Sequence, residues 1–294
     1  MRIAVAGSHG LIGSALTDSL AASGHQVTRL VRGTESGSGQ IRWDPEAEPL
    51  APEVLDGVDA VVGLGGVGIG DARWSGAVKQ RLRDSRITPT EVLAEAVRDA
   101  GIPVFVNASA TGYYGDTGRD AVTEASPAGT GFLAGLTADW EAATAAASES
   151  SRVVLLRTAP VLSRSGGLLA RLRRIYRLGL GGPIGSGRQF FSWITLPDAI
   201  GAITHALTDE DIAGPVNLSA PQQVRYREFS DLLAARLHRP AFVHVPGAVA
   251  RAAGGEMAQE LLLASSRVEP AVLTGTGYVF EQPTLAEALE YTDA

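Results

Sequence analysis

Short apolar runs alternate with longer stretches of helical periodicity through the first half of the chain. Five runs have the length and apolar content of buried strands: residues 2–6, 25–31, 58–64, 102–107 and 153–156. Helical patterns lie between them, in the stretch that ends at residue 22 and in residues 74–100 and 136–148. This alternation is typical of βαβ units, and strands that are apolar throughout are typical of parallel sheets covered on both faces. The sequence therefore predicts an α/β fold with a doubly wound parallel sheet of about seven strands.

The alternation is broken in two places. Residues 33–40 are rich in Gly and Ser, which predicts a mobile loop. After about residue 160, Gly and Pro become more frequent, and short helices and strands replace the regular pattern. This second change predicts a smaller lobe that follows the main sheet.

A glycine-rich loop, residues 7–13, separates the first predicted strand from the first helix, with the spacing G-x-x-G-x-x-G. Glycines let the backbone turn sharply and approach a pyrophosphate, and the helix N-terminus beyond supplies N–H donors. The loop therefore predicts cofactor contacts from Gly7, His9, Gly10, Leu11, Ile12 and Gly13. The alternatives are a plain tight turn and, for His9, a loop residue without a function.

The end of the second predicted strand indicates which dinucleotide binds. Enzymes that use NAD usually have an acidic residue there, which binds the ribose 2′-hydroxyl. This chain has Val31 and Arg32 instead, and a guanidinium suits the 2′-phosphate of NADP(H). The sequence predicts NADP(H) as the cofactor, with a solvated surface arginine as the alternative for Arg32.

Composition excludes several other functions. The 294-residue chain has a formal net charge of −7, no Cys, and Lys79 as its only lysine. The absence of Cys removes thiolate chemistry, and the five His residues show no metal-ligand spacing, so no metal site is predicted. The excess of acidic over basic residues argues against nucleic acid as a partner. No apolar run is long enough to span a membrane, so no membrane partner is predicted. The chain also shows no signal-peptide pattern, and we expect a cytoplasmic protein.

Several motifs resemble those of extended short-chain dehydrogenases/reductases: the glycine loop, Asn107-Ala-Ser109-Ala, Tyr113-Tyr114-Gly115 and Asp198. More specific segments resemble an atypical branch known as epimerase family or nucleoside-diphosphate-sugar epimerase-like proteins. These segments are Arg42-Trp43-Asp44, Lys79-Gln-Arg81, Gly185-Ser-Gly-Arg-Gln189 and Gly255-Glu256-Met257-Ala258.

The resemblance implies a Rossmann domain that binds NADP(H) and a small lobe that closes over the nicotinamide end. Asp198 resembles the acidic residue at which extended members return to the main domain. The expected division is therefore residues 1–160 plus 188–213 for the Rossmann domain, and 161–187 plus 214–294 for a discontinuous substrate lobe. Further cofactor contacts are expected at Leu64, Gly65, Gly66, Arg86 and Pro160.

The catalytic pattern of that superfamily is absent here. Active members use a Tyr and a Lys four residues later, and no tyrosine of this chain has that lysine. Aligning Glu141 with the glutamate that follows the family motif puts Leu133 and Thr137 at the Tyr and Lys places. Ser109 and Tyr113 are the remaining catalytic candidates, as hydrogen-bond donors to a substrate carbonyl. The alternative gives Ser109 a backbone-capping role and packs Tyr113 beside the nicotinamide.

Two functional hypotheses follow. The first is an NADP(H)-dependent oxidoreductase or epimerase that acts on an unidentified small molecule. The intact cofactor-binding motifs of the N-terminal half support it. The second is a non-catalytic regulatory or structural protein that binds NADP(H), and the missing Tyr–Lys pair supports it. A homodimer is left open by the sequence.

Overall fold

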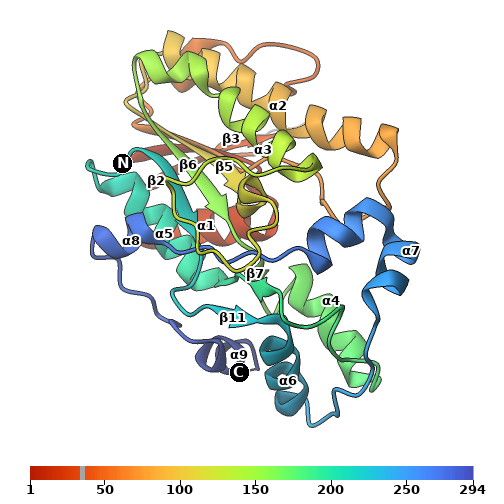
Figure 1. Cartoon of the computed structure of the whole chain (residues 1–294). Coiled ribbons are helices and arrows are strands. Elements are labelled where there is room, and N and C mark those ends of the chain that lie inside the picture. Colours follow the sequence, from red (N-terminus) through yellow and green to blue (C-terminus); the bar gives the residue numbers. More distant parts are fainter. Residues whose placement is uncertain (34–36, 294) are drawn as a thin grey trace.

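A seven-stranded parallel sheet forms the centre of the molecule in the computed structural model, which describes residues 1–33 and 37–293 (Figure 1). Its strands follow the order β3-β2-β1-β4-β5-β6-β10, and every neighbouring pair is parallel. The strands are β1 (Arg2–Ala6), β2 (Gln26–Val31), β3 (Gln40–Arg42), β4 (Ala60–Gly63), β5 (Val104–Ala110), β6 (Arg152–Thr158) and β10 (Gly214–Leu218). The predicted doubly wound α/β fold is confirmed.

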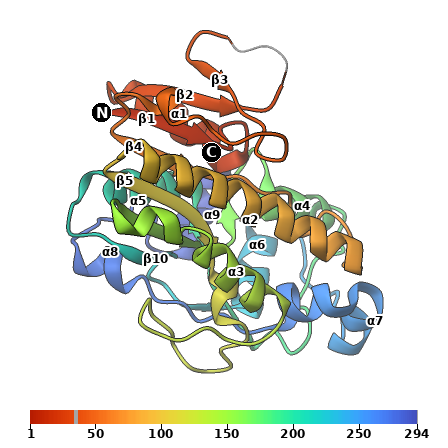
Figure 2. The same ribbon diagram turned by 90° about the horizontal axis from the view of Figure 1, so that it is seen from above.

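Two layers of helices cover the sheet. Helices α1 (Leu11–Ala22) and α5 (Leu196–Thr208) pack on one face, and α2 (Gly76–Asp99) and α3 (Phe132–Ala142) lie side by side on the other (Figure 2). Single-turn helices occupy Pro52–Leu55, Thr111–Tyr114 and Ala145–Glu149. The predicted helix over residues 74–100 is continuous through the buried Pro89.

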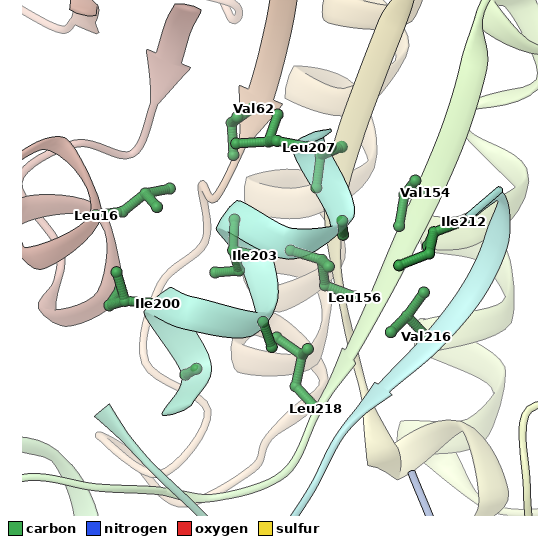
Figure 3. Packing of buried hydrophobic residues seen from close by; sticks show 14 of the residues in the cluster. Leu16, Val62, Val154, Leu156, Ile200, Ile203, Leu207, Ile212, Val216 and Leu218 are labelled. Atoms are coloured by element: carbon green, nitrogen blue, oxygen red, sulfur yellow. The ribbon is translucent and has the colours of Figure 1, made fainter. Parts of the chain in front are cut away.

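The largest buried cluster joins the sheet to α1 and α5. Ile200, Ile203 and Leu207 project from α5 toward Leu16 of α1 and toward the strands (Figure 3). Each side chain that leaves water here contributes roughly 1.5–3 kcal/mol. The cluster fixes α1, and therefore the loop before it, against the sheet.

The remaining elements lie outside the main sheet. They are β7 (Val161–Leu162), α4 (Gly167–Arg177), β8 (Phe190–Phe191), β9 (Ile194–Thr195), β11 (Val224–Arg225), α6 (Tyr226–Arg236), α7 (Gly247–Ala258), a π-helical turn (Gln259–Leu263), α8 (Ala271–Gly275) and α9 (Leu285–Asp293). Most of them lie in a smaller lobe, whereas α8 packs on β10 with Leu273 in the main core. A separate core around Trp193 and Phe229 holds α4, α6 and α9 together.

Two strands of the main sheet differ from the sequence prediction. Strand β10, which the expected division places in the small lobe, is the outer strand of the main sheet beside β6. Pro215 obscured it, since Pro argues against a strand except at a sheet edge, which is where β10 lies. Strand β3 begins at Gln40, inside the predicted loop of residues 33–40, of which 34–36 lie outside the described residues. Over residues 1–33 and 37–293, no helix is long and apolar enough to cross a membrane.

Shortening Leu16 tests the packing between α1 and α5. Because Leu16 is fully buried, Leu16→Ala should leave a cavity and lower the free energy of unfolding by about 2–5 kcal/mol. The matched control is Leu178→Ala, at a side chain that is 75% exposed, with an expected change within about 0.5 kcal/mol. Denaturant unfolding measures both, and equal losses in the two variants would contradict this description of the core.

Candidate functional site

The glycine loop between β1 and α1 depends on two close backbone approaches. A Cβ atom at Gly13 would lie 2.1 Å from the carbonyl oxygen of Gly7, and one at Gly7 would lie 2.6 Å from the carbonyl carbon of Leu64. Gly7 also has a φ of +77°, which side-chain-bearing residues rarely adopt. These contacts explain why glycine occupies both positions, and they bring the loop against the end of β4.

The first turn of α1 is ready to bind an anion. Its N-cap is Gly10, which offers no side-chain acceptor, and the turn contains no acidic residue. The first N–H groups of a helix have no partner within the helix, and the helix dipole favours a negative charge beside them. The N–H groups of Leu11, Ile12 and Gly13 therefore suit a pyrophosphate, which is the chemistry that the loop spacing predicts.

A cavity of about 280 Å³ lies beside the loop, at the carboxyl edge of the sheet. Seven of the predicted cofactor residues line it: Gly7, His9, Gly10, Val31, Arg32, Gly65 and Gly66. Its remaining lining residues include Trp43, Ser85, Pro89, Thr90 and Asn107, which the sequence analysis did not assign to the cofactor. The cavity runs from the end of β2, past the glycine loop, to Asn107 in the middle of β5.

Arg32 occupies one end of this cavity. Its side chain is 57% exposed, and its Nη1 lies 3.6 Å from Oε1 of Glu46. A pair this exposed is weak, because water and salt screen it. The guanidinium is therefore available to a stronger anion, with Glu46 as its partner in the free protein.

Arg86 braces the loop after β4. Its Nη2 donates to the carbonyl of Val67 at 2.9 Å, and its Nη1 donates to the carbonyl of Leu82 at 3.1 Å. Burial lowers the pKa of Arg86 to about 10, so the group is charged at neutral pH. Arg86 thus holds the loop that carries Gly66, whose Cβ would lie 3.2 Å from its guanidinium carbon.

The other predicted cofactor residues do not line the cavity. Ile12 and Leu64 pack against the main core, and Leu11 lies next to Gly166 and Gly167 of the small lobe. Pro160 is exposed, and its carbonyl accepts a hydrogen bond from the N–H of Ile194 at 3.2 Å. Gly13 and Arg86 are also absent from the lining, and for all thirteen predicted residues contact with a cofactor stays a prediction.

A buried ion pair lies beneath the loop that follows β5. Arg157 of β6 makes two hydrogen bonds of 2.8 Å to the carboxylate of Glu141 on α3, and their side chains are 4% and 10% exposed. Burial disfavours the charge, yet the bonds to Glu141 and to the hydroxyl of Tyr114 leave the pKa of Arg157 above its ordinary value. Arg157 is therefore charged throughout the physiological range.

This ion pair determines what Ser109 can do. The Ser109 hydroxyl, on a residue that is 4% exposed, donates to Oε1 of Glu141 at 2.5 Å. Ser109 thus bonds a side-chain carboxylate. This role is neither of the two that the sequence suggests, which are a hydrogen bond to a substrate and a hydrogen bond to the backbone. To donate to a substrate, it would have to give up a charge-assisted hydrogen bond.

Tyr113 and Tyr114 have different environments. The hydroxyl of Tyr114 donates to Asn217 at 2.7 Å, and burial raises its pKa despite the hydrogen bond from Arg157. Tyr113 is half-buried, and the Arg157 guanidinium carbon lies 3.5 Å from its ring centroid. Within the described part of the chain, the Tyr113 hydroxyl makes no hydrogen bond, so it is free to bind a ligand.

The backbone beside Tyr113 meets the helix that carries the catalytic pair in the superfamily. A Cβ atom at Gly112 would lie 3.2 Å from Cβ of Leu133 and 3.8 Å from Oγ1 of Thr137. These are the two positions that the sequence alignment assigns to the missing Tyr and Lys. Tyr113 therefore directly follows Gly112, which packs against the two positions where the superfamily has its catalytic Tyr and Lys.

Arg157 is the site residue that the sequence analysis missed. A signal existed, because Arg157 directly follows the apolar run at residues 153–156, and a charge in the continuation of such a strand needs a buried partner. The identity of that partner, Glu141, depends on how α3 packs on the sheet, which local pattern does not reveal.

Comparison with known proteins identifies the family. A model of the NAD dependent epimerase/dehydratase family matches residues 3–219, which include the glycine loop and all of the sheet except Arg2. The chain belongs to this family. A second model, described as a domain of unknown function, matches residues 245–292.

Relatives in this family cover nearly the whole chain. An epimerase family protein of Mycobacterium tuberculosis is 50% identical over 290 residues, 98% of this chain and 96% of that protein. The human epimerase family protein SDR39U1 is 38% identical, over 99% of both chains. A crystal structure of the human protein (isoform 2) with NADPH has a TM-score of 0.91 at 37% identity and covers 99% of both chains.

A second solved structure, a nucleoside-diphosphate sugar epimerase from Corynebacterium glutamicum, has a TM-score of 0.82 at 35% identity. It covers 99% of this chain and 58% of that one. UDP-glucose 4-epimerase from Thermotoga maritima has a TM-score of 0.75 at 18% identity, and this likeness extends to the fold alone.

Neutralising Glu141 tests the buried pair. Glu141→Gln keeps the shape of the side chain but leaves the buried charge of Arg157 without its counter-charge, which should lower the free energy of unfolding by about 3–5 kcal/mol. Asp139→Asn is the matched control on the same helix, because Asp139 pairs with Arg83 at an exposed site and should cost about 0–1 kcal/mol. Thermal or denaturant unfolding compares them, and a loss below 1 kcal/mol for Glu141→Gln would contradict the role assigned to the pair.

Proposed function

We propose that this protein binds NADP(H) and transfers a hydride to or from a small molecule, as an oxidoreductase or an epimerase. The observation that carries the proposal is the position of Tyr113. Tyr113 lies in the turn that follows β5, directly after Gly112, which packs against Leu133 and Thr137, and its hydroxyl makes no hydrogen bond within the described part of the chain.

The residues around the cavity fit the cofactor. The uncapped first turn of α1 suits the pyrophosphate, and Arg32 suits the 2′-phosphate, with no acidic residue at the end of β2 to oppose it. The human relative solved with NADPH supports the same assignment here. Bound NADP(H) supplies or accepts a hydride at its nicotinamide ring.

Tyr113 supplies the polar group that such a reaction needs at the substrate oxygen. A phenol can donate a hydrogen bond to a carbonyl oxygen and stabilise the negative charge that develops there. Arg157, held against the ring of Tyr113 by Glu141, fixes the ring and adds a positive charge nearby. This chain's residues would thus orient and polarise a substrate without a Tyr–Lys couple, and we expect slow turnover.

A second candidate function is supported by Ser109. Its hydroxyl is committed to Glu141, so Ser109, one of the two catalytic candidates, has no free hydroxyl to donate to a substrate. This favours a protein that binds NADP(H) without turnover and acts as a regulatory or structural component.

Removing the Arg32 guanidinium tests the cofactor preference. Arg32→Ala should weaken NADPH binding about tenfold or more, because a charge-assisted hydrogen bond to a phosphate contributes roughly 1.5–3 kcal/mol. NADH, which lacks the 2′-phosphate, serves as the control ligand, and its affinity should stay the same. Titration by nicotinamide fluorescence measures both, and equal losses for the two nucleotides would remove Arg32 from the 2′-phosphate site.

Turnover distinguishes the two candidate functions. We expect slow NADPH oxidation with at least one member of a panel of carbonyl compounds and quinones. Tyr113→Phe should then lower kcat about tenfold or more, whereas Ser109→Ala should change it less than threefold, because the Ser109 hydroxyl already bonds Glu141. Binding of NADPH without oxidation on any substrate would favour the non-catalytic protein, and full activity of Tyr113→Phe would contradict the role of Tyr113.

A further inference from the structure

Residues 256–263 form a segment with unusual backbone geometry, which we call the strap. It follows Gly255, whose φ of +60° and ψ of −140° break helix α7, and its second half is the π-helical turn Gln259–Leu263. Only glycine adopts the conformation of Gly255 without strain, and single π turns frequently occur at functional sites. The strap is thus joined to the rest of α7 through one flexible residue.

Two carboxylates attach the strap to the main domain. Glu256 forms an ion pair with Lys79 of α2, the only lysine of the chain. Glu260 accepts hydrogen bonds of 2.8 Å from the N–H groups of Phe132 and Leu133, the first residues of α3. The two acids are four residues apart, so one helical face carries both.

Glu260 supplies a cap that α3 lacks. The N-cap residue of α3 is Gly131, and its first turn contains no acidic residue. A carboxylate at a helix N-terminus satisfies free N–H groups and is favoured by the helix dipole. The end of α3 nearest to Tyr113 is therefore completed by a residue that lies more than one hundred positions later in the chain.

Lys79 and Glu260 act on the same turn of α3. The Lys79 ammonium lies 4.8 Å from the ring centroid of Phe132, whose backbone N–H donates to Glu260. Figures 1 and 2 both place α7 next to the first turns of α2, where Lys79 lies. The ion pair and the cap thus form one continuous contact area between the strap and the main domain.

The other end of the strap is fixed to the small lobe. The carbonyl of Leu262 accepts a hydrogen bond of 3.0 Å from Gln189, and Leu263 contacts Gly185. The strap therefore bridges the two lobes beside Leu133, which packs against the segment that precedes Tyr113.

We propose that the strap is a hinged closure over the first turn of α3 and the area around Tyr113, where the proposed function places the substrate, with Gly255 as its hinge and Glu256 and Glu260 as its clasps. The Lys79 and Glu256 side chains are 28% and 46% exposed, so their ion pair is screened and easily broken. Opening would uncover the first turn of α3 and the area around Tyr113, and closing would exclude water from it. This inference concerns access to the cleft, and it holds whether or not hydride transfer occurs there.

Amide hydrogen exchange tests the opening. Lys79→Gln should speed exchange at residues 132, 133 and 256–263 about two- to fivefold, because it removes one clasp without touching those amides. Arg83→Gln is the matched control, because it removes another ion pair of α2, with Asp139, that does not involve the strap. Equal exchange in Lys79→Gln, Arg83→Gln and the unmodified protein would overturn the proposal.

Access to the cleft is measured separately, by acrylamide quenching of the fluorescence of bound NADPH. Glu260→Ala and Lys79→Gln should both increase the quenching constant, and 0.5 M NaCl should increase it in the unmodified protein. Arg83→Gln should leave it unchanged. Faster exchange of the strap without any increase in quenching would overturn its role as a closure, even if NADPH is turned over normally.

Discussion

The guanidinium of Arg157 is the constraint around which the carboxyl edge of the sheet is arranged. A charge buried to this extent must be paired, and the cost of leaving it unpaired is several kcal/mol. Glu141 supplies the counter-charge, the hydroxyl of Tyr114 and the carbonyl of Glu124 accept hydrogen bonds from Nη1 of Arg157, and the hydroxyl of Ser109 donates to Glu141. The positions of α3 and of the loop after β5 relative to each other follow from these bonds.

That arrangement leaves one polar group free. Ser109 and Tyr114 are both engaged by the ion pair, while Tyr113 is held by its ring face and keeps an unbonded hydroxyl. In this site the hydroxyl of Ser109 bonds Glu141 and only the hydroxyl of Tyr113 is left for a ligand, which differs from the Tyr–Lys pair of the superfamily. The two candidate functions differ in whether the Tyr113 hydroxyl contacts a substrate.

The sequence predicts the features of the site that depend on local pattern. The glycine loop follows from the spacing of Gly7, Gly10 and Gly13, and the position of Arg32 follows from the end of an apolar strand. Features that depend on distant pairing are not predictable in this way. Glu260 caps α3 from a segment whose local pattern shows only a short helix, and Arg157 meets Glu141 only after α3 packs on the sheet.

The region matched as a domain of unknown function is attached to the main domain at several points. Besides the strap, the N–H groups of Glu281 and Gln282 donate to the buried carboxylate of Asp198, and the N–H of Val272 donates to Glu124. These bonds reach the helix α5 and the loop beneath the sheet edge. The C-terminal region is therefore bonded to the main domain at α5 and at Glu124 as well as through the strap.

The most direct test of the account is a crystal structure of the NADPH complex. We expect the 2′-phosphate at Arg32, the pyrophosphate at the N–H groups of residues 11–13, and the nicotinamide facing the hydroxyl of Tyr113. A nicotinamide ring that lies away from Tyr113, or an adenosine that leaves Arg32 paired with Glu46, would contradict it.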